Sequence, residues 1–234
     1  MKKLLQNSVL CCCLLSTIVL ANDFDAGMQA VQRGHYETAL RTLLPLAESG
    51  MAKAQNNLGH LHEKGLGVSQ SYTEALAWYV KAGTQGLAKA QHNVGMLYFN
   101  GTGVVKDHAE AYAWFELAAS QGLPEAQYML GLSEYRGMGR EINQGAARVW
   151  FLKSALLGYA NAQFMYAYML QSGDGGESEP STAMVWSSIA GRNGKSGAAA
   201  ISSMSAQLMT DAQLNDVEAM IEQCLNTNYA DCPQ

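Results

Sequence analysis

Proline and charged side chains are scarce in this chain of 234 residues. It holds four Pro, and charged residues make up 15% of the sequence, whereas 48% of the residues are hydrophobic. Because proline interrupts helix interiors, its scarcity beside frequent Ala and Met favours helices over sheets. The length suits one large or two small domains of this kind.

The sequence also lacks the motifs of familiar enzymes and metal sites. His60 and His62 are the one close pair of His, but two residues apart on a helix they point to different sides. His62-Glu63 begins like the helix of a zinc protease, yet Leu66 stands where the second His is needed. The Gly-x-Gly triplets lack the rest of a nucleotide-binding loop, and no Ser-x-x-Lys or Gly-x-Ser-x-Gly occurs. We therefore expect no catalytic, cofactor-binding or metal-binding residues.

The first 21 residues have the pattern of a secretory signal peptide. Lys2 and Lys3 precede an uncharged stretch over residues 4–20, and the small Ala21 precedes the predicted cleavage site. An uncleaved membrane anchor is the alternative, although three polar residues near its start interrupt the apolar run. The sequence thus predicts a signal peptide over 1–21 and a periplasmic or secreted protein with no membrane span after cleavage.

The charge balance restricts the class of partner. Removal of Lys2 and Lys3 leaves 13 basic against 20 acidic residues, a formal charge of −7. A chain with this charge has no basic surface for nucleic acid or for an anionic membrane. The expected partner is therefore a protein or a peptide.

A period of 36 residues organises the chain. Every Trp falls at one phase of this period, and Ala, Gln and Gly recur at other phases with the same spacing. Such self-similarity is typical of repeat architectures whose units stack on one another. The recurring positions include Trp78, Trp114, Trp150 and Trp186; Gln55, Gln91, Gln127 and Gln163; and Gly50, Gly86, Gly122, Gly158 and Gly194.

Each repeat predicts a pair of helices, A and B. Apolar residues within 90–98 recur at helical spacing and line one face of a helix A, which a Gly-x-Gly triplet then ends. Ser71, Asp107 and Asn143 occupy one phase just before helix B, where they are good N-caps. We expect each Trp of helix B to fill the space between successive helix pairs.

These residues carry a family resemblance. The string Ala-Gln-x-x-Leu-Gly-x-Leu, Gly-x-Gly-Val, Ala-x-x-Trp and a closing Gly, present over 54–86 and closely repeated over 90–122, resembles the Sel-1-like repeat, a relative of the tetratricopeptide repeat. The resemblance implies an all-α fold, a right-handed α/α superhelix, with four 36-residue repeats over residues 51–194. In the fourth repeat Ala167 replaces the Gly of helix A and Gly176 the Val of the loop. We therefore expect that repeat to be distorted or more mobile.

Atypical units are expected at both ends of the array. Residues 22–50 resemble a shorter tetratricopeptide-type hairpin and predict an N-terminal cap. Thr210 with Gln213 predicts a capping box that opens a last helix, within a C-terminal cap of residues 195–234.

Two Cys remain after signal cleavage, Cys224 and Cys232. In an oxidising compartment this pair predicts a disulfide that ties the last helix to the tail. The alternative is a redox-active dithiol, which favours Cys-x-x-Cys spacing rather than the seven intervening residues found in this chain.

The resemblance also implies where a partner binds. Tetratricopeptide-like arrays present their A helices on a concave face, and the outward residues of these helices change from polar to aromatic along the chain. Aromatic anchors suit a bound helix or extended peptide. A packing role for the same aromatic residues stays open, because helical aromatic residues at such spacing commonly belong to the core. The candidates are Asn56, His60, His92, Met96, Tyr128, Leu132, Phe164 and Tyr168.

The favoured function is that of an exported scaffold or adaptor that binds a protein or peptide and carries no enzyme activity. A secreted factor that contacts a host protein is the first alternative. A hydrolase that acts on β-lactams or peptidoglycan is the second. We expect the protein to be a monomer.

Overall fold

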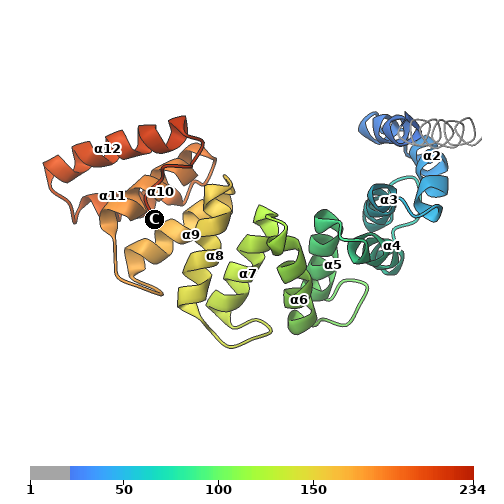
Figure 1. Cartoon of the computed structure of the whole chain (residues 1–234), viewed down its shortest axis with the longest axis horizontal. Helices are drawn as coiled ribbons and strands as arrows, with labels where there is room; N and C mark the ends of the chain where they lie inside the picture. The colour runs from blue at the N-terminus through green and yellow to red at the C-terminus, as the bar shows by residue number, and fades with distance from the viewer. Residues whose placement is uncertain (1–21) are drawn as a thin grey trace, which may run out of the picture. The chain divides into compact units, whose positions relative to one another are not determined.

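The computed structural model describes residues 22–234, and every regular element in that range is an α-helix (Figure 1). The predicted signal peptide and its cleavage site lie outside the described residues. The helices are the segment 22–32, α2 (Tyr36–Glu48), α3 (Ala52–Lys64), α4 (Tyr72–Thr84), α5 (Ala88–Asn100), α6 (His108–Ser120), α7 (Pro124–Arg136), α8 (Gln144–Leu156), α9 (Ala160–Ser172), α10 (Pro180–Arg192), α11 (Ala198–Ala206) and α12 (Asp211–Asn226).

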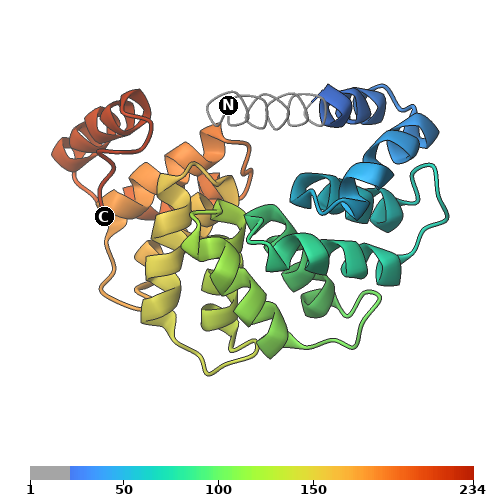
Figure 2. The same cartoon turned by 45° about the vertical axis from the view of Figure 1, so that its right-hand side comes forward.

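The chain divides into two compact units, one that ends at Lys106 and one that begins at Asp107. In the first unit α2 packs on α3, α3 on α4 and α4 on α5. In the second unit each helix from α6 to α10 packs on the next, and α10 also contacts α11 and α12 (Figure 2). Each unit is thus a row of helices in which neighbours along the chain are neighbours in space.

Side-chain caps begin the B helices as expected. Ser71, Asp107 and Asn143 each accept a backbone N–H bond from the first turn of α4, α6 and α8 respectively. Thr210 and Gln213 form a complete capping box at the start of α12. These bonds satisfy N–H groups that have no partner inside the helix. The predicted helix starts are confirmed.

Glycines end the A helices in a conformation that other residues rarely adopt. Gly137 follows α7 at φ 69° and closes it as a left-handed C-cap. Two residues later Gly139 has φ 78°, and a Cβ at this position would lie 2.3 Å from the backbone oxygen of His108. The loop therefore lies directly against the start of α6, and the second Gly of the triplet permits that approach.

The core aromatic residue of the first three repeats follows the Trp rather than being the Trp itself. Tyr79, Phe115 and Phe151 are fully buried, whereas the Trp before each of them is partly exposed. A Cβ added to Gly59 would lie 2.6 Å from the Tyr79 ring, and one added to Gly131 would lie 2.6 Å from the Phe151 ring. In both repeats the ring of helix B thus packs on a glycine of helix A. These rings fill the space inside a helix pair, whereas the expectation for Trp concerned the space between successive pairs and stays a prediction.

The fourth repeat departs from this arrangement without being distorted. Its helices α9 and α10 have 13 residues each, the same length as α7 and α8. Ser187 stands at the phase of the core ring, so Ala167 fits where the earlier repeats have Gly. Trp186 is fully buried, and its Nε1 donates to the Pro233 carbonyl at 2.8 Å. The smaller side chain on helix B and the larger one on helix A compensate each other.

The C-terminal segment closes the second unit. Helix α12 lies along α10 (Figure 1), and its Val217 and Ile221 belong to the same buried cluster as Val185 and Ile189 of α10. Cys224 and Cys232 form a disulfide with a Cα–Cα distance of 4.6 Å. The predicted disulfide is confirmed, and it ties the tail to α12.

Candidate partner-binding site

All eight candidate residues lie on A helices, two on each. The first unit carries those of α3 and α5, and the second unit those of α7 and α9. In chain order they are Asn56 and His60, His92 and Met96, Tyr128 and Leu132, and Phe164 and Tyr168.

The site of the first unit is a polar hollow of about 330 Å³. Met96 is the one candidate that lines it, while the neighbouring Asn93 donates from Nδ2 to Asn56 Oδ1 at 3.1 Å. His60 is exposed and His92 partly buried. Amide and carboxylate groups dominate the lining, which favours hydrogen bonds to a polar segment. The lining residues are Glu63, Tyr72, Asn93, Met96, Leu97, Asn100 and Thr102.

Glu63 supplies the charge of this hollow. Its carboxylate accepts hydrogen bonds from Tyr79 Oη at 2.8 Å and from Lys64 Nζ at 2.6 Å. Burial opposes ionisation of Glu63, but the hydrogen bonds from Lys64 and Tyr79 outweigh it, so the pKa of this carboxyl lies below its ordinary value. The hollow therefore holds a fixed negative charge at neutral pH.

The site of the second unit is a hollow of about 320 Å³ whose lining includes two aromatic rings. Tyr128 of α7 and Phe164 of α9 line it together with Met165. Asn161 and Lys195 form a polar edge, because Lys195 Nζ donates to Asn161 Oδ1 at 2.6 Å. The loop of residues 194–197 completes the lining. An apolar pocket with a few placed polar groups is the usual form of a ligand or peptide site.

The candidates of the second unit differ in how far they belong to the core. Tyr128, Leu132 and Phe164 are partly buried and pack against the core cluster of this unit. The Tyr128 ring centroid lies 5.3 Å from that of Tyr159 in an edge-on arrangement. Tyr168 is 41% exposed. Tyr128 and Phe164 thus combine packing with one open side, whereas Tyr168 is the exposed member of the four.

Sequence reasoning missed a buried carboxylate in the second unit. Glu134 of α7 is buried, and it accepts hydrogen bonds from Tyr112 Oη at 2.9 Å and Arg140 Nη1 at 3.0 Å. Burial and the hydrogen bond to Glu134 raise the pKa of Tyr112 to about 12. No repeat pattern signals this cluster, since the residues one period before and after Glu134 are Tyr98 and Leu170. Both donors to its Oε1 come from the chain itself, which indicates a structural role, while its Oε2 is buried with no hydrogen-bond partner in the described residues.

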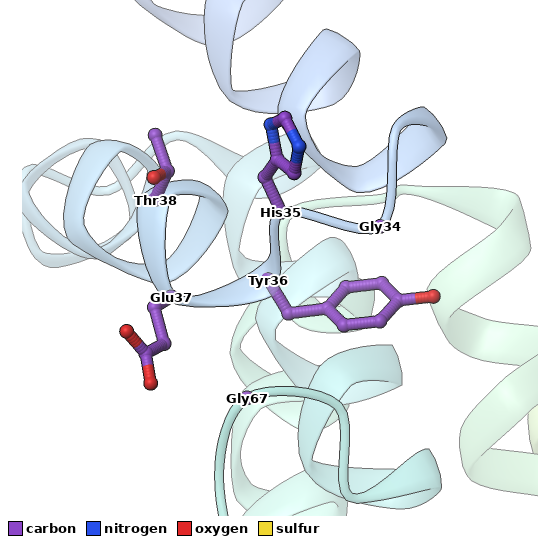
Figure 3. A pocket seen from close by; sticks show the side chains of 6 residues that line it. All are labelled: Gly34, His35, Tyr36, Glu37, Thr38 and Gly67. Carbon is purple, nitrogen blue, oxygen red and sulfur yellow. The ribbon is translucent and has the colours of Figure 1, made fainter.

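A further hollow, of about 460 Å³, lies beside the start of α2. Its lining includes His35, Glu37 and Gly67, and Figure 3 shows the imidazole and the carboxylate pointing away from each other. This arrangement places no acid next to a base. Over residues 22–234, no group of three or more His, Cys, Asp or Glu side chains lies close enough to hold a metal ion. Within the same range no helix is both long and apolar enough to cross a membrane.

Comparison with known proteins identifies the family of this helix array. The family model of the Sel1 repeat matches residues 52–87, 88–123, 124–159 and 160–195, together more than half of the chain. The chain belongs to the Sel1 repeat family. A crystal structure of a Sel1 repeat protein from Oxalobacter formigenes is 31% identical and superposes with a TM-score of 0.70, covering 75% of this chain and 72% of that chain.

A second solved Sel1-like structure is a protective antigen present in uropathogenic Escherichia coli strains. It is 27% identical, with a TM-score of 0.73, and the match covers 88% of this chain but 50% of that chain. No functionally curated protein matches the sequence significantly.

Family membership confirms the predicted fold class, an all-α solenoid of tandem Sel1 repeats. Sel1 repeats generally mediate protein–protein interaction, and the fold is typically a scaffold without enzyme activity. The Sel1 assignment leaves the binding face and the partner to be argued from the residues of this chain.

Proposed function

We propose that this Sel1 repeat protein is an exported scaffold that binds a peptide or protein segment on its A helices. The observation that carries the proposal is the hollow of the second unit, where Tyr128 and Phe164 line an apolar floor beside Lys195 and Asn161. An aromatic floor with a cationic edge accommodates an apolar side chain whose neighbouring carbonyl or carboxylate group reaches the lysine.

The polar hollow of the first unit complements this anchor. Asn93 and Asn100 present amide groups that bind main-chain groups of an extended segment, and Met96 offers an adaptable apolar contact. The proposed role of this hollow is hydrogen bonding to a polar segment, independent of the second unit.

Export rests on the signal-peptide pattern and on the disulfide. A bond between Cys224 and Cys232 is typical of the periplasm or the extracellular space, because cytosolic thiols are kept reduced. Fractionation of cells that produce the full chain tests this part. Recovery of uncleaved, reduced protein in the cytosol would contradict it.

Crosslinking tests the binding face. A photoreactive phenylalanine analogue at Tyr168, which is 41% exposed, should capture the partner in the native cell envelope. The same analogue at Leu117, 50% exposed on helix B, is the matched control and should not capture that partner. Phe164→Ala should then weaken the captured complex about tenfold or more, as loss of an aromatic anchor does. Capture from Leu117 alone, with unchanged affinity of folded Phe164→Ala protein, would overturn the proposed face.

Contact with a host protein is a second candidate function. It is favoured by the likeness to the protective antigen of uropathogenic strains, a protein of related fold. Secretion assays distinguish it from the first candidate, since a host-contact factor must leave the cell or reach its surface. Retention of all mature protein in the periplasm would exclude it.

A further inference from the structure

One row of side chains on α8 departs from the repeat pattern. Val149 and Lys153 of α8 and Leu157, which follows its last residue, are spaced four residues apart, so they share one face. Val149 is 51% and Leu157 54% exposed, and Lys153 is exposed as well. We name these three residues the α8 face.

Leu157 interrupts an amide ladder, by which we mean a pair of side-chain amides that joins helix A to helix B within a repeat and recurs along the array. In the first repeat Gln85 Nε2 donates to Gln55 Oε1 at 2.7 Å, and in the fourth Asn193 Nδ2 donates to Gln163 Oε1 at 2.8 Å. In both pairs the donor lies 30 residues after the acceptor. Leu157 has this position in the third repeat and has no group to donate.

The matching acceptor is left without a partner. Gln127 is 7% exposed, and its Nε2 donates to the Ala119 carbonyl at 3.4 Å. Its Oε1 is buried and has no hydrogen-bond partner within the described part of the chain. A buried acceptor without a donor is costly and uncommon in native proteins. An exposed leucine and an unmet acceptor therefore coincide in one repeat.

The next helix B shows what covers such a face. Val185 and Ile189 of α10 lie one period after Val149 and Lys153, and both are fully buried. They share the core cluster with apolar residues of α12, which packs on α10 (Figure 1). On α10 this face is covered by an amphipathic helix, α12. The same kind of helix is therefore expected to cover the equivalent face of α8.

The charge of that occupant is acidic. Helix α12 carries four acidic and no basic side chains, and the cation of the α8 face is Lys153, whose Nζ lies 4.2 Å from the Trp150 ring centroid. The tail that follows α12 already reaches the border of the α8 face, because a Cβ at Gly158 would lie 3.0 Å from the Tyr229 ring. The acidic residues of α12 are Asp211, Asp216, Glu218 and Glu222.

We propose that the α8 face binds an acidic amphipathic helix of a partner protein. Apolar residues of that helix cover Val149 and Leu157, and an acidic side chain pairs with Lys153. This surface is on helix B and is separate from the proposed site on the A helices, so either proposal can fail without the other.

A peptide of this chain's own α12 serves as the probe. A fluorescent peptide of residues 210–226, with Cys224→Ser to prevent crosslinking, should bind the intact protein and report through its anisotropy. Leu157→Glu should weaken binding about tenfold or more, since it replaces a covered apolar group by a charge that repels the acidic probe. Ile142→Glu is the matched control, because Ile142 is 65% exposed in the same unit but lies outside the α8 face. Its affinity should equal that of the unsubstituted protein.

Two further variants test the parts of the proposal. Leu157→Gln supplies Gln127 with an internal donor and should also weaken the probe several-fold while leaving the fold intact. A probe whose four acidic residues are changed to amides should bind several-fold more weakly and lose its salt dependence. Phe164→Ala, in the site on the A helices, should leave probe binding unchanged.

Three results would overturn the proposal. If Leu157→Glu binds the probe as tightly as the unsubstituted protein, the probe exchanges with the resident α12 on α10. If sedimentation shows a dimer that Leu157→Glu dissociates, the occupant is a second copy of the chain. If the probe does not bind at all, even at low salt, the face does not accept an acidic helix.

Discussion

The break in the amide ladder predicts that one substitution in the third repeat stabilises the protein. Leu157→Gln places an amide where Gln85 and Asn193 stand in the first and fourth repeats, and its Nε2 can reach Gln127 Oε1. A buried acceptor without a partner costs about 1–3 kcal/mol, and a neutral hydrogen bond in its place contributes about 1 kcal/mol net.

Leu157→Glu isolates that hydrogen bond. Glu has nearly the shape of Gln and keeps the same methylene contacts, but at neutral pH it only accepts hydrogen bonds. We expect the Gln variant to exceed the Glu variant by about 1 kcal/mol in the free energy of unfolding, or about 2–4 °C in Tm for a chain of this size. Because stacked repeats need not unfold in one step, chemical denaturation should be read beside hydrogen exchange of the α8 amides.

Equal stability of the Gln and Glu variants would refute the ladder argument. A reciprocal substitution adds a second check within the same chain. Gln85→Leu removes the donor of Gln55 in the first repeat, and it should cost about 1 kcal/mol by the same reasoning. If Gln85→Leu is neutral, the ladder does not contribute measurably to stability.

Three other predictions follow from the packing. Trp186→Ala should destabilise the protein by about 3–5 kcal/mol because its side chain is fully buried, whereas Trp114→Ala, at a partly exposed position, should cost far less; thermal melts compare the two. Cys224→Ser should lower stability by about 2–3 kcal/mol through loss of a short disulfide loop, with increased hydrogen exchange confined to the tail and α12. Gly131→Ala should destabilise the protein by about 1–3 kcal/mol despite the better helix propensity of Ala, because its Cβ would overlap the neighbouring Phe ring. Gly145→Ala is the control: the nearest atom is 3.6 Å from the new Cβ, so this variant should lose no stability.

Features set by one or two neighbouring residues were predictable from the sequence. Each N-cap, at Ser71, Asp107 and Asn143, depends on one side chain and the first turn of its own helix. A capping residue that recurs every 36 positions was therefore enough to predict where helix B starts. The capping box at Thr210 is equally local. Helix boundaries and the repeat period followed from such signals.

The choice of core residue was less predictable, because it depends on contacts between helices. Trp78 and Tyr79 are both large and adjacent, and the 100° between them on a helix does not tell which one faces inward. Gly59 determines that Tyr79 faces inward, because a helix A without a side chain at this position leaves room for the Tyr79 ring. The candidate site has the same difficulty, since Tyr128 and Phe164 each have one side in the core and one side on the hollow.

Two repeats depart from the pattern, and the difference between their departures locates the surface proposed for a partner. In the fourth repeat the loss of a core ring at Ser187 is made good inside the chain by Ala167 and by the buried Trp186. In the third repeat Leu157 cannot donate a side-chain hydrogen bond, and no other group of the described chain replaces it. Gln127 Oε1 is therefore left without a hydrogen-bond partner. A defect that the fold corrects reflects packing alone. The missing donor of the third repeat is an exposed Leu at the end of α8, whereas the equivalent face of α10 is covered by α12, and that exposed apolar surface is what the partner helix is proposed to cover.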